Sequence, residues 1–123
     1  MIKSIFILGI GSFAGGALRH YLSTLAKSCC GQEFPYGTLA VNLVGCLIFG
    51  ILFALFQRVE ETYSPWCLLL TTGLCGGFTT FSTFSHESMM MSQSGNYIGF
   101  AIYIAASIIL GLVLIAVGMI IFR

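Results

Sequence analysis

The sequence predicts an all-α membrane protein with four transmembrane helices, the third of which is broken. Three observations predict this class: 58% of the 123 residues are hydrophobic, only 7% are charged, and the mean hydropathy is +1.00. Such a composition excludes an ordinary soluble domain. We expect the whole chain, residues 1–123, to form a single four-helix transmembrane domain.

Four apolar stretches each have about the 20 residues that a helix needs to span a bilayer. The first is interpreted as a helix of the mature protein and not as a signal peptide, because it contains glycines, ends in Arg19 and His20, and lacks a small-residue cleavage site. Short polar connections separate the stretches. The predicted spans run from Ile5 to Leu25, Thr38 to Gln57, Trp66 to Ser85 and Tyr97 to Phe122.

The third stretch contains the poorest helix-forming sequence of the chain, GLCGGFTTFSTFSHE from Gly73 to Glu87. Its glycines weaken the helix, and its threonines and serines offer the backbone competing hydrogen bonds. We therefore predict an interruption between Gly76 and Thr80. Non-helical backbone survives at membrane depth only where protein buries it or where water and ions meet it, so the break predicts an ion or substrate site.

The positive charges are almost evenly divided between the two sides of the membrane. Four crossings place Lys3, Arg58 and Arg123 on one side and Arg19 and Lys27 on the other, a bias of a single charge. The positive-inside rule then gives almost no instruction about orientation. Insertion in both orientations, which allows an antiparallel dimer, and one weakly set orientation both remain open. Four short helices enclose little space, so we expect a homo-oligomer.

Several function classes are excluded by what the chain lacks. The apolar segments contain no acid–base pair, no nucleophile beside a general base and no phosphate loop, so an enzyme is not expected. The five basic residues are scattered and form no patch for nucleic acid. The five cysteines show neither a disulfide framework nor zinc spacing, and the two histidines are isolated.

Polar and aromatic residues recur in pairs that each share one helix face. An isolated aromatic pair is usually core or lipid-facing, whereas a membrane amide such as Asn42 must either bond a neighbouring helix or meet an ion. The charges nearest the membrane are Arg19 and Glu87, and Glu87 is expected past the end of the third helix. The pairs are Thr38 with Asn42, Phe81 with Phe84, and Tyr103 with Ser107.

Neutral donors of this kind suit the passive dehydration of a small anion, whereas a proton-coupled transporter needs a titratable group at depth. The edge of a phenyl ring is the positive end of its quadrupole, so a small anion can sit against it. Ring edges, the Asn42 amide and the hydroxyls of Thr83 and Ser107 would together replace part of the water that such an ion loses.

Three motifs make the chain resemble a known family, the small fluoride channels called Fluc or CrcB. They are GGALRH around Arg19, PYGTLAVNLVG around Asn42, and the Gly73–Glu87 segment. The resemblance covers almost the whole chain. It implies a passive, selective channel that exports cytoplasmic fluoride across the bacterial plasma membrane, that is, the cell or inner membrane.

The resemblance further implies an antiparallel, dual-topology homodimer with two pores and a structural sodium ion at its centre. The backbone carbonyls of Gly76 and Thr79 from both subunits would hold the sodium ion. Gly111, one turn beyond Ser107, departs from the hydroxyl row of the family. The implied ion pathway consists of Asn42, Phe81, Phe84, Thr83, Tyr103 and Ser107, with Arg19 near a vestibule.

Two alternatives from other classes remain. A small multidrug-type, proton-coupled exporter would share the four helices but is expected to carry a carboxylate in its first helix, and this chain has none there. A non-conducting packing subunit would explain the glycines and aromatics, but it would not require Asn42, the hydroxyl rows and a broken helix together.

Overall fold

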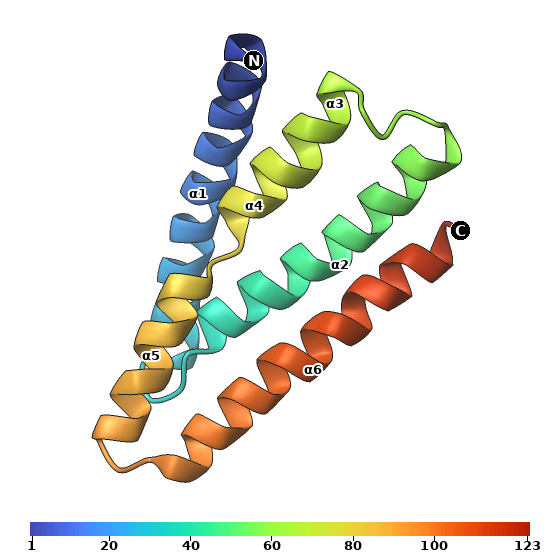
Figure 1. The fold of residues 1–123 in the computed structure, drawn as a ribbon. Coiled ribbons are helices and arrows are strands. Elements are labelled where there is room, and N and C mark those ends of the chain that lie inside the picture. Colours follow the sequence, from blue (N-terminus) through green and yellow to red (C-terminus); the bar gives the residue numbers. More distant parts are fainter.

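The computed structural model describes residues 1–123 and is entirely helical (Figure 1). Four helical stretches are long and apolar enough to cross a membrane, as predicted. The first is α1 (Ile2–Cys30), the second α2 (Tyr36–Arg58) and the last α6 (Tyr97–Ile121). The third consists of α3 (Pro65–Cys67), η1 (Leu68–Cys75), α4 (Gly76–Phe78) and α5 (Phe81–Gln93).

The first three helical stretches extend beyond the predicted apolar stretches, whereas α6 ends one residue before its predicted end. The largest difference is in the third. It continues to Gln93 and not only to Ser85, so Glu87 lies inside α5 and the expectation that it lies past the helix end is wrong. Hydropathy alone missed this continuation because the residues after Ser85 are polar or amphipathic. Glutamate and methionine are nevertheless good helix formers, which explains why the helix persists.

The predicted interruption of the third helix is confirmed. Ser64 caps its start by accepting a hydrogen bond from the Cys67 amide at 3.1 Å. The residues of η1 then form wide π-helical turns, a feature frequent at functional sites. The helix breaks at Thr79 (φ −84°, ψ 157°) and Thr80 (φ −147°, ψ 120°), both of which are extended.

Close helix approach depends on glycine at two contacts. A Cβ atom at Gly11 of α1 would lie 2.5 Å from the Leu69 carbonyl oxygen of η1, so only glycine fits. A Cβ atom at Gly118 of α6 would lie 2.7 Å from the Leu47 carbonyl oxygen of α2. Small residues at helix interfaces allow this close approach in lipid.

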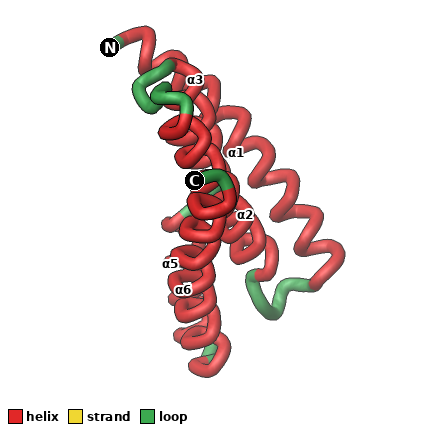
Figure 2. The backbone as a smooth tube through the Cα atoms, turned by 90° about the vertical axis from the view of Figure 1, so that its right-hand side faces the viewer, coloured by secondary structure: helices red, strands yellow, loops and turns green.

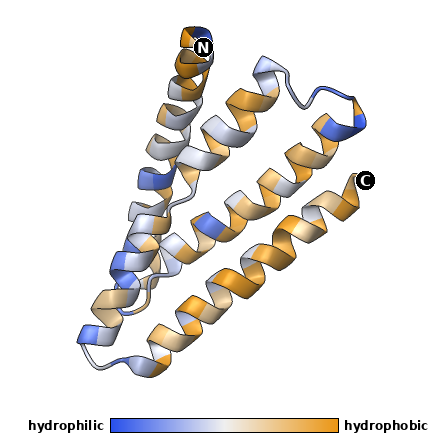
Figure 3. Cartoon of the chain, in the orientation of Figure 1, coloured by the Kyte–Doolittle hydropathy of each residue, from blue (hydrophilic) through white to orange (hydrophobic).

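Alternate crossings place the connections at opposite ends of the molecule. Figure 2 shows the α1–α2 loop and the α5–α6 turn toward one end and the α2–α3 loop toward the other. Consequently α2 and α6 run in the same direction, side by side (Figure 1). Figure 3 shows α6 coloured as hydrophobic along most of its length, and many of its large apolar side chains are exposed to the surroundings.

Candidate ion pathway

The break in the third helix is held by a side chain from α2. The Asn42 Nδ2 atom donates to the Thr80 carbonyl at 3.1 Å, and the Thr80 amide donates to Asn42 Oδ1 at 2.8 Å. The amide thus satisfies both backbone groups of Thr80 at once, which matters because unpaired backbone is costly in a membrane. Of the two roles considered for Asn42, the structure shows the bond to a neighbouring helix.

The same contacts leave two carbonyls without their helical donors. In a continuous helix, the amides of Thr80 and Thr83 would bond the carbonyls of Gly76 and Thr79. The Thr80 amide bonds Asn42 instead, and the Thr83 amide donates to the Thr80 side-chain oxygen at 3.2 Å. These two carbonyls are the ones that the family resemblance assigned to sodium.

A cavity of about 350 Å³ has Gly76 and Thr79 among its lining residues. Backbone carbonyl oxygens are hard ligands, and freed ones at membrane depth suit an ion, so the residues present are chemically compatible with a small hard cation. One chain supplies only two such groups here. The lining residues are Gly45, Cys46, Phe49, Thr71, Thr72, Cys75, Gly76, Thr79 and Ile115.

Arg19 of α1 forms a second side-chain contact near the break. Its Nε atom donates to the Gly77 carbonyl at 3.3 Å. In a continuous helix this carbonyl would bond the amide of Phe81, from which the extended residues Thr79 and Thr80 separate it. Arg19 therefore compensates for a hydrogen bond that the break removes.

Three aromatic rings form a row from α5 to α6. The ring centroids of Phe81 and Phe84 are 5.7 Å apart, and those of Phe84 and Tyr103 are 5.1 Å apart in an edge-to-face arrangement. Phe84 is half-buried, whereas the Phe81 side chain is 79% exposed. The predicted pair is thus on one face, and its outer ring is free to contact another molecule.

The carboxylate of Glu87 accepts hydrogen bonds from two of the predicted hydroxyl donors. It accepts from the Thr38 hydroxyl and from the Tyr103 hydroxyl, each at 2.7 Å. Tyr103 is completely buried, and the Phe34 ring packs edge-on against it at 5.6 Å. Sequence reasoning assigned no role to Glu87, although its position three residues after Phe84 was a signal that the two share a helix face.

Ser107 differs from the other hydroxyl-bearing residues of the pathway. Its Oγ atom is buried and has no hydrogen-bond partner, whereas Thr83 and Tyr103 both make hydrogen bonds. An unsatisfied hydroxyl of this kind is uncommon and calls for an explanation. The Ser107 hydroxyl therefore has an unused hydrogen-bonding capacity within this chain.

A hollow of about 410 Å³ is lined by residues of the α1–α2 loop, of α5 and of the turn before α6. Thr38 and Glu87 belong to its wall, together with the cationic side chain of Lys27 and the imidazole of His86. The hollow therefore reaches Glu87 from the end of the molecule at which the α1–α2 loop lies. Arg19 is not part of this wall.

Comparison with known proteins shows similarity along almost the whole chain. A family model described as CrcB-like protein, Camphor Resistance (CrcB), matches residues 6–119. A fluoride-specific ion channel FluC of Phocaeicola vulgatus is 40% identical over 117 residues, which cover 95% of this chain and 96% of that protein. Proteins of the same name from Rhizobium johnstonii (39% identical; 100% and 98% covered) and Leptospira interrogans (39%; 89% and 87%) agree.

These matches also bear on class and location. The relatives carry the name of an ion channel, which confirms the prediction that the chain is not an enzyme. Four membrane-capable helices in a family of bacterial channels make the chain a multi-pass plasma-membrane protein, as predicted. The chain belongs to the CrcB-like protein family.

Proposed function

We propose that this protein is a passive, selective fluoride channel that exports cytoplasmic fluoride down its gradient, without ATP and without a proton acceptor in the pore. One observation carries the proposal: the chain matches relatives named fluoride-specific ion channels over nearly its entire length, at about 40% identity. Several neutral donors and aromatic rings along the predicted pathway support it.

Dehydration of fluoride is the step that the pathway must make possible. The positive edges of Phe81 and Phe84 would face the ion and replace part of its hydration shell. The buried hydroxyl of Ser107, which has no partner within the chain, would donate to it further along. The amide of Asn42 and the hydroxyl of Thr83, which both bond Thr80 at the break, would contribute further donors. None of these groups carries a charge that would trap the anion.

Glu87 acts in this proposal as a positioning residue. Its carboxylate occupies the hydroxyls of Thr38 and Tyr103, so neither is free to bind the anion in this arrangement. The two bonds fix the Tyr103 ring edge-to-face with Phe84, and this contact keeps the aromatic row in place. Tyr103 thus contributes to the pathway through its ring.

An antiparallel, dual-topology homodimer with two pores would complete the site. Phe81 is 79% exposed, so a single chain does not cover the outer side of the row formed by Phe81, Phe84 and Tyr103. Gly76 and Thr79, whose carbonyls lack their helical donors, line one cavity, and a two-fold partner would double the number of such carbonyls. Nearly balanced positive charges favour insertion in both orientations.

A structural sodium ion would be held by the carbonyls of Gly76 and Thr79 from both subunits. When bound, the ion would supply a fixed positive charge at the dimer centre. Thermal dissociation of the dimer, measured at equal ionic strength in sodium chloride and in choline chloride, tests this. We expect the higher midpoint in sodium, because choline is too large for carbonyl ligands; equal midpoints would contradict the sodium site.

Fluoride efflux from liposomes tests the function itself. Vesicles containing the purified protein would be loaded with potassium fluoride or potassium chloride, and valinomycin would remove the potassium diffusion potential. We expect rapid fluoride efflux, measured with a fluoride electrode, and no chloride efflux. Phe81→Ile and Phe84→Ile should sharply reduce the flux, whereas Phe53→Ile, which alters an aromatic pair on α2, should not.

The outcomes separate the competing functions. Unchanged flux in both Phe81→Ile and Phe84→Ile would refute the ring-edge mechanism while leaving a channel. No efflux from folded protein would favour the packing subunit. Efflux only in the presence of a proton gradient would favour the multidrug-type exporter, although α1 carries no carboxylate for it.

A further inference from the structure

Gly45 of α2 lies against Thr79, the first extended residue of the break. A Cβ atom added at Gly45 would collide with the Cγ2 methyl group of Thr79 and would lie 3.2 Å from the Cδ2 atom of Phe78. Gly45 and Phe78 are both buried, so neither contact opens to the surroundings. The missing side chain of Gly45 therefore provides the space in which the Thr79 side chain is seated.

The Thr79 side chain is also held by its hydroxyl group. The hydroxyl donates to the Cys75 carbonyl at 3.0 Å, and the Thr79 amide donates to the same carbonyl at 3.0 Å. A β-branched side chain has few χ1 rotamers, and its two branches rotate together. A rotation that withdrew the methyl group from Gly45 would therefore also take the hydroxyl away from Cys75.

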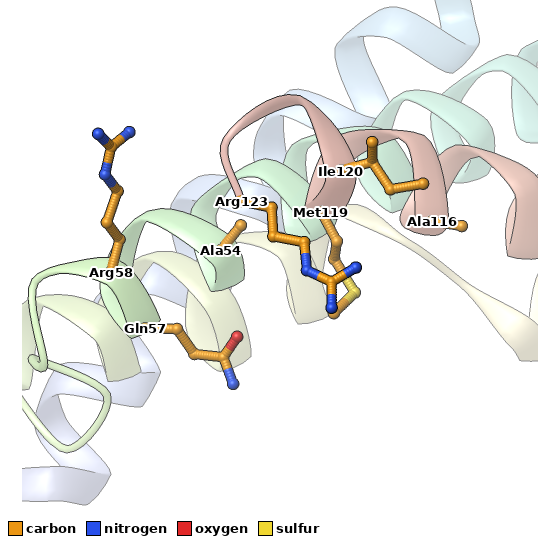
Figure 4. A pocket seen from close by; sticks show the side chains of 7 residues that line it. All are labelled: Ala54, Gln57, Arg58, Ala116, Met119, Ile120 and Arg123. Carbon is orange, nitrogen blue, oxygen red and sulfur yellow. The ribbon is translucent and has the colours of Figure 1, made fainter.

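The side of α2 that faces α6 leaves the helix no room to recoil from Thr79. Leu47 follows Gly45 by two residues, which places it close to the opposite side of the helix. A Cβ atom added at Gly118 of α6 would lie only 2.7 Å from the Leu47 carbonyl oxygen. A groove separates α2 from α6 near their carboxyl-terminal ends, well beyond this contact (Figure 4). Its lining residues include Ala54, Arg58 and Arg123.

Asn42 and Gly45 act on the same peptide unit of the break. They are three residues apart on α2 and so share a helix face. The Thr80 amide donates to Asn42 Oδ1 at 2.8 Å. In a planar trans peptide, the N–H of Thr80 and the C=O of Thr79 point in opposite directions, so the Thr79 carbonyl points away from the Asn42 side chain. Asn42 fixes this unit through its N–H, and Gly45 fixes it through the Thr79 side chain.

We propose that Gly45 is a positioning residue that sets the direction of the Thr79 carbonyl. An alanine at this position displaces the Thr79 methyl group, breaks the hydroxyl bond to Cys75 and turns the peptide unit between Thr79 and Thr80. The seating of Thr79 stands on these contacts alone. Its consequence for a cation rests on the proposed function, which assigns the Thr79 carbonyl to a sodium ion.

Hydrogen–deuterium exchange of backbone amides, followed by NMR spectroscopy in detergent micelles without sodium, tests the seating. Gly45→Ala should accelerate exchange of the Thr80 amide about tenfold, the ratio expected from overpacking a buried site. The Cys67 amide, which donates to the Ser64 side chain at the start of the same helix, should exchange at an unchanged rate.

Gly111→Ala on α6 is the matched control for a methyl group added beside α2. Its Cβ atom would meet only the Cys46 Sγ atom, at the ordinary contact distance of 3.5 Å. Exchange at Thr80 should therefore stay as it is in the unsubstituted protein.

A second substitution at Thr79 identifies the colliding group. Thr79→Ser removes the methyl group and keeps the hydroxyl, so Gly45→Ala combined with Thr79→Ser should restore slow exchange at Thr80. Thr79→Val keeps a methyl group and removes the hydroxyl, so its combination with Gly45→Ala should not. Circular dichroism and gel filtration check that each variant is folded.

Thermal dissociation of the dimer in sodium chloride and in choline chloride extends the test to the cation. Gly45→Ala should lose most of the difference between the two midpoints, and Thr79→Ser should restore it. Equal midpoints for the unsubstituted protein would refute the sodium site but not the seating, which exchange at Thr80 tests by itself.

Three results would overturn the inference about Gly45. Unchanged exchange at Thr80 in Gly45→Ala would mean that the added methyl group fits without moving the peptide unit. Equal acceleration at Thr80 and Cys67 would mean that the whole helix is loosened. Failure of Thr79→Ser to restore slow exchange would place the collision at another group. None of these readouts depends on fluoride flux, so the inference can fail while the channel proposal stands.

Discussion

Truncation of Asn42 to alanine probes the contact on which the broken helix depends. The change removes the bonds from Nδ2 to the Thr80 carbonyl (3.1 Å) and from the Thr80 amide to Oδ1 (2.8 Å). Thr79 and Thr80 are extended, so these groups cannot regain helical partners without rebuilding the break. An unsatisfied buried group costs about 1–3 kcal/mol, hence Asn42→Ala should lose roughly 2–6 kcal/mol of unfolding free energy.

The free energy of unfolding can be measured by titration with sodium dodecyl sulfate in mixed micelles, with helicity followed by circular dichroism. Ser107→Ala is the matched control, because it removes a polar group from the same pathway whose oxygen has no partner. We expect that control to be as stable as the unsubstituted protein or more stable, because it removes a buried hydroxyl that has no partner. If Asn42→Ala were as stable as Ser107→Ala, the argument that the amide supports the break would be refuted.

Three further predictions use the same unfolding measurement. Gly11→Ala should lower the free energy of unfolding by about 1–3 kcal/mol, because the added Cβ would lie 2.5 Å from a backbone oxygen. Gly9→Ala should be neutral or stabilising, because nothing lies within 4 Å of its added Cβ. Equal effects of the two substitutions would contradict the packing argument. Tyr103→Phe keeps the ring but removes the hydroxyl that donates to Glu87. A hydrogen bond to a charged group contributes about 1.5–3 kcal/mol, so we expect the free energy of unfolding to fall by that amount. An unchanged free energy of unfolding would mean that water replaces the hydroxyl. Ser64→Ala removes the helix cap and should cost about 0.5–2 kcal/mol, and an unchanged midpoint would mean that the cap contributes nothing.

Local composition predicted most of the helical architecture. Each apolar stretch forms a helix because backbone groups in lipid have no water to bond and must bond one another. Such stretches can be recognised from sequence because hydropathy is averaged over contiguous residues. The break was also predictable, since glycines and hydroxyl side chains weaken the helix at their own positions in the sequence. Glu87 was misplaced for the same reason: hydropathy falls after Ser85, but helical structure continues to Gln93.

The partners of the pathway residues were not predictable from local sequence. Asn42 bonds a residue 38 positions away, and Thr38 bonds Glu87 across 49 positions. Such contacts depend on the rotation and depth of each helix relative to its neighbour, which the spacing of residues on one helix does not specify. Spacing placed Tyr103 and Ser107 on one face, but only packing made one hydroxyl bonded and the other free.

By itself, the sequence determined the class of protein, the four spans, the position of the break and the resemblance to a family, because these follow from composition and from contiguous motifs. The tertiary structure decided that Asn42 holds the break and that Glu87 binds both Thr38 and Tyr103. It also brought Arg58 and Arg123 to one groove. The physical reason is that a hydrogen bond between helices forms only when packing brings its donor and acceptor within about 3 Å of each other.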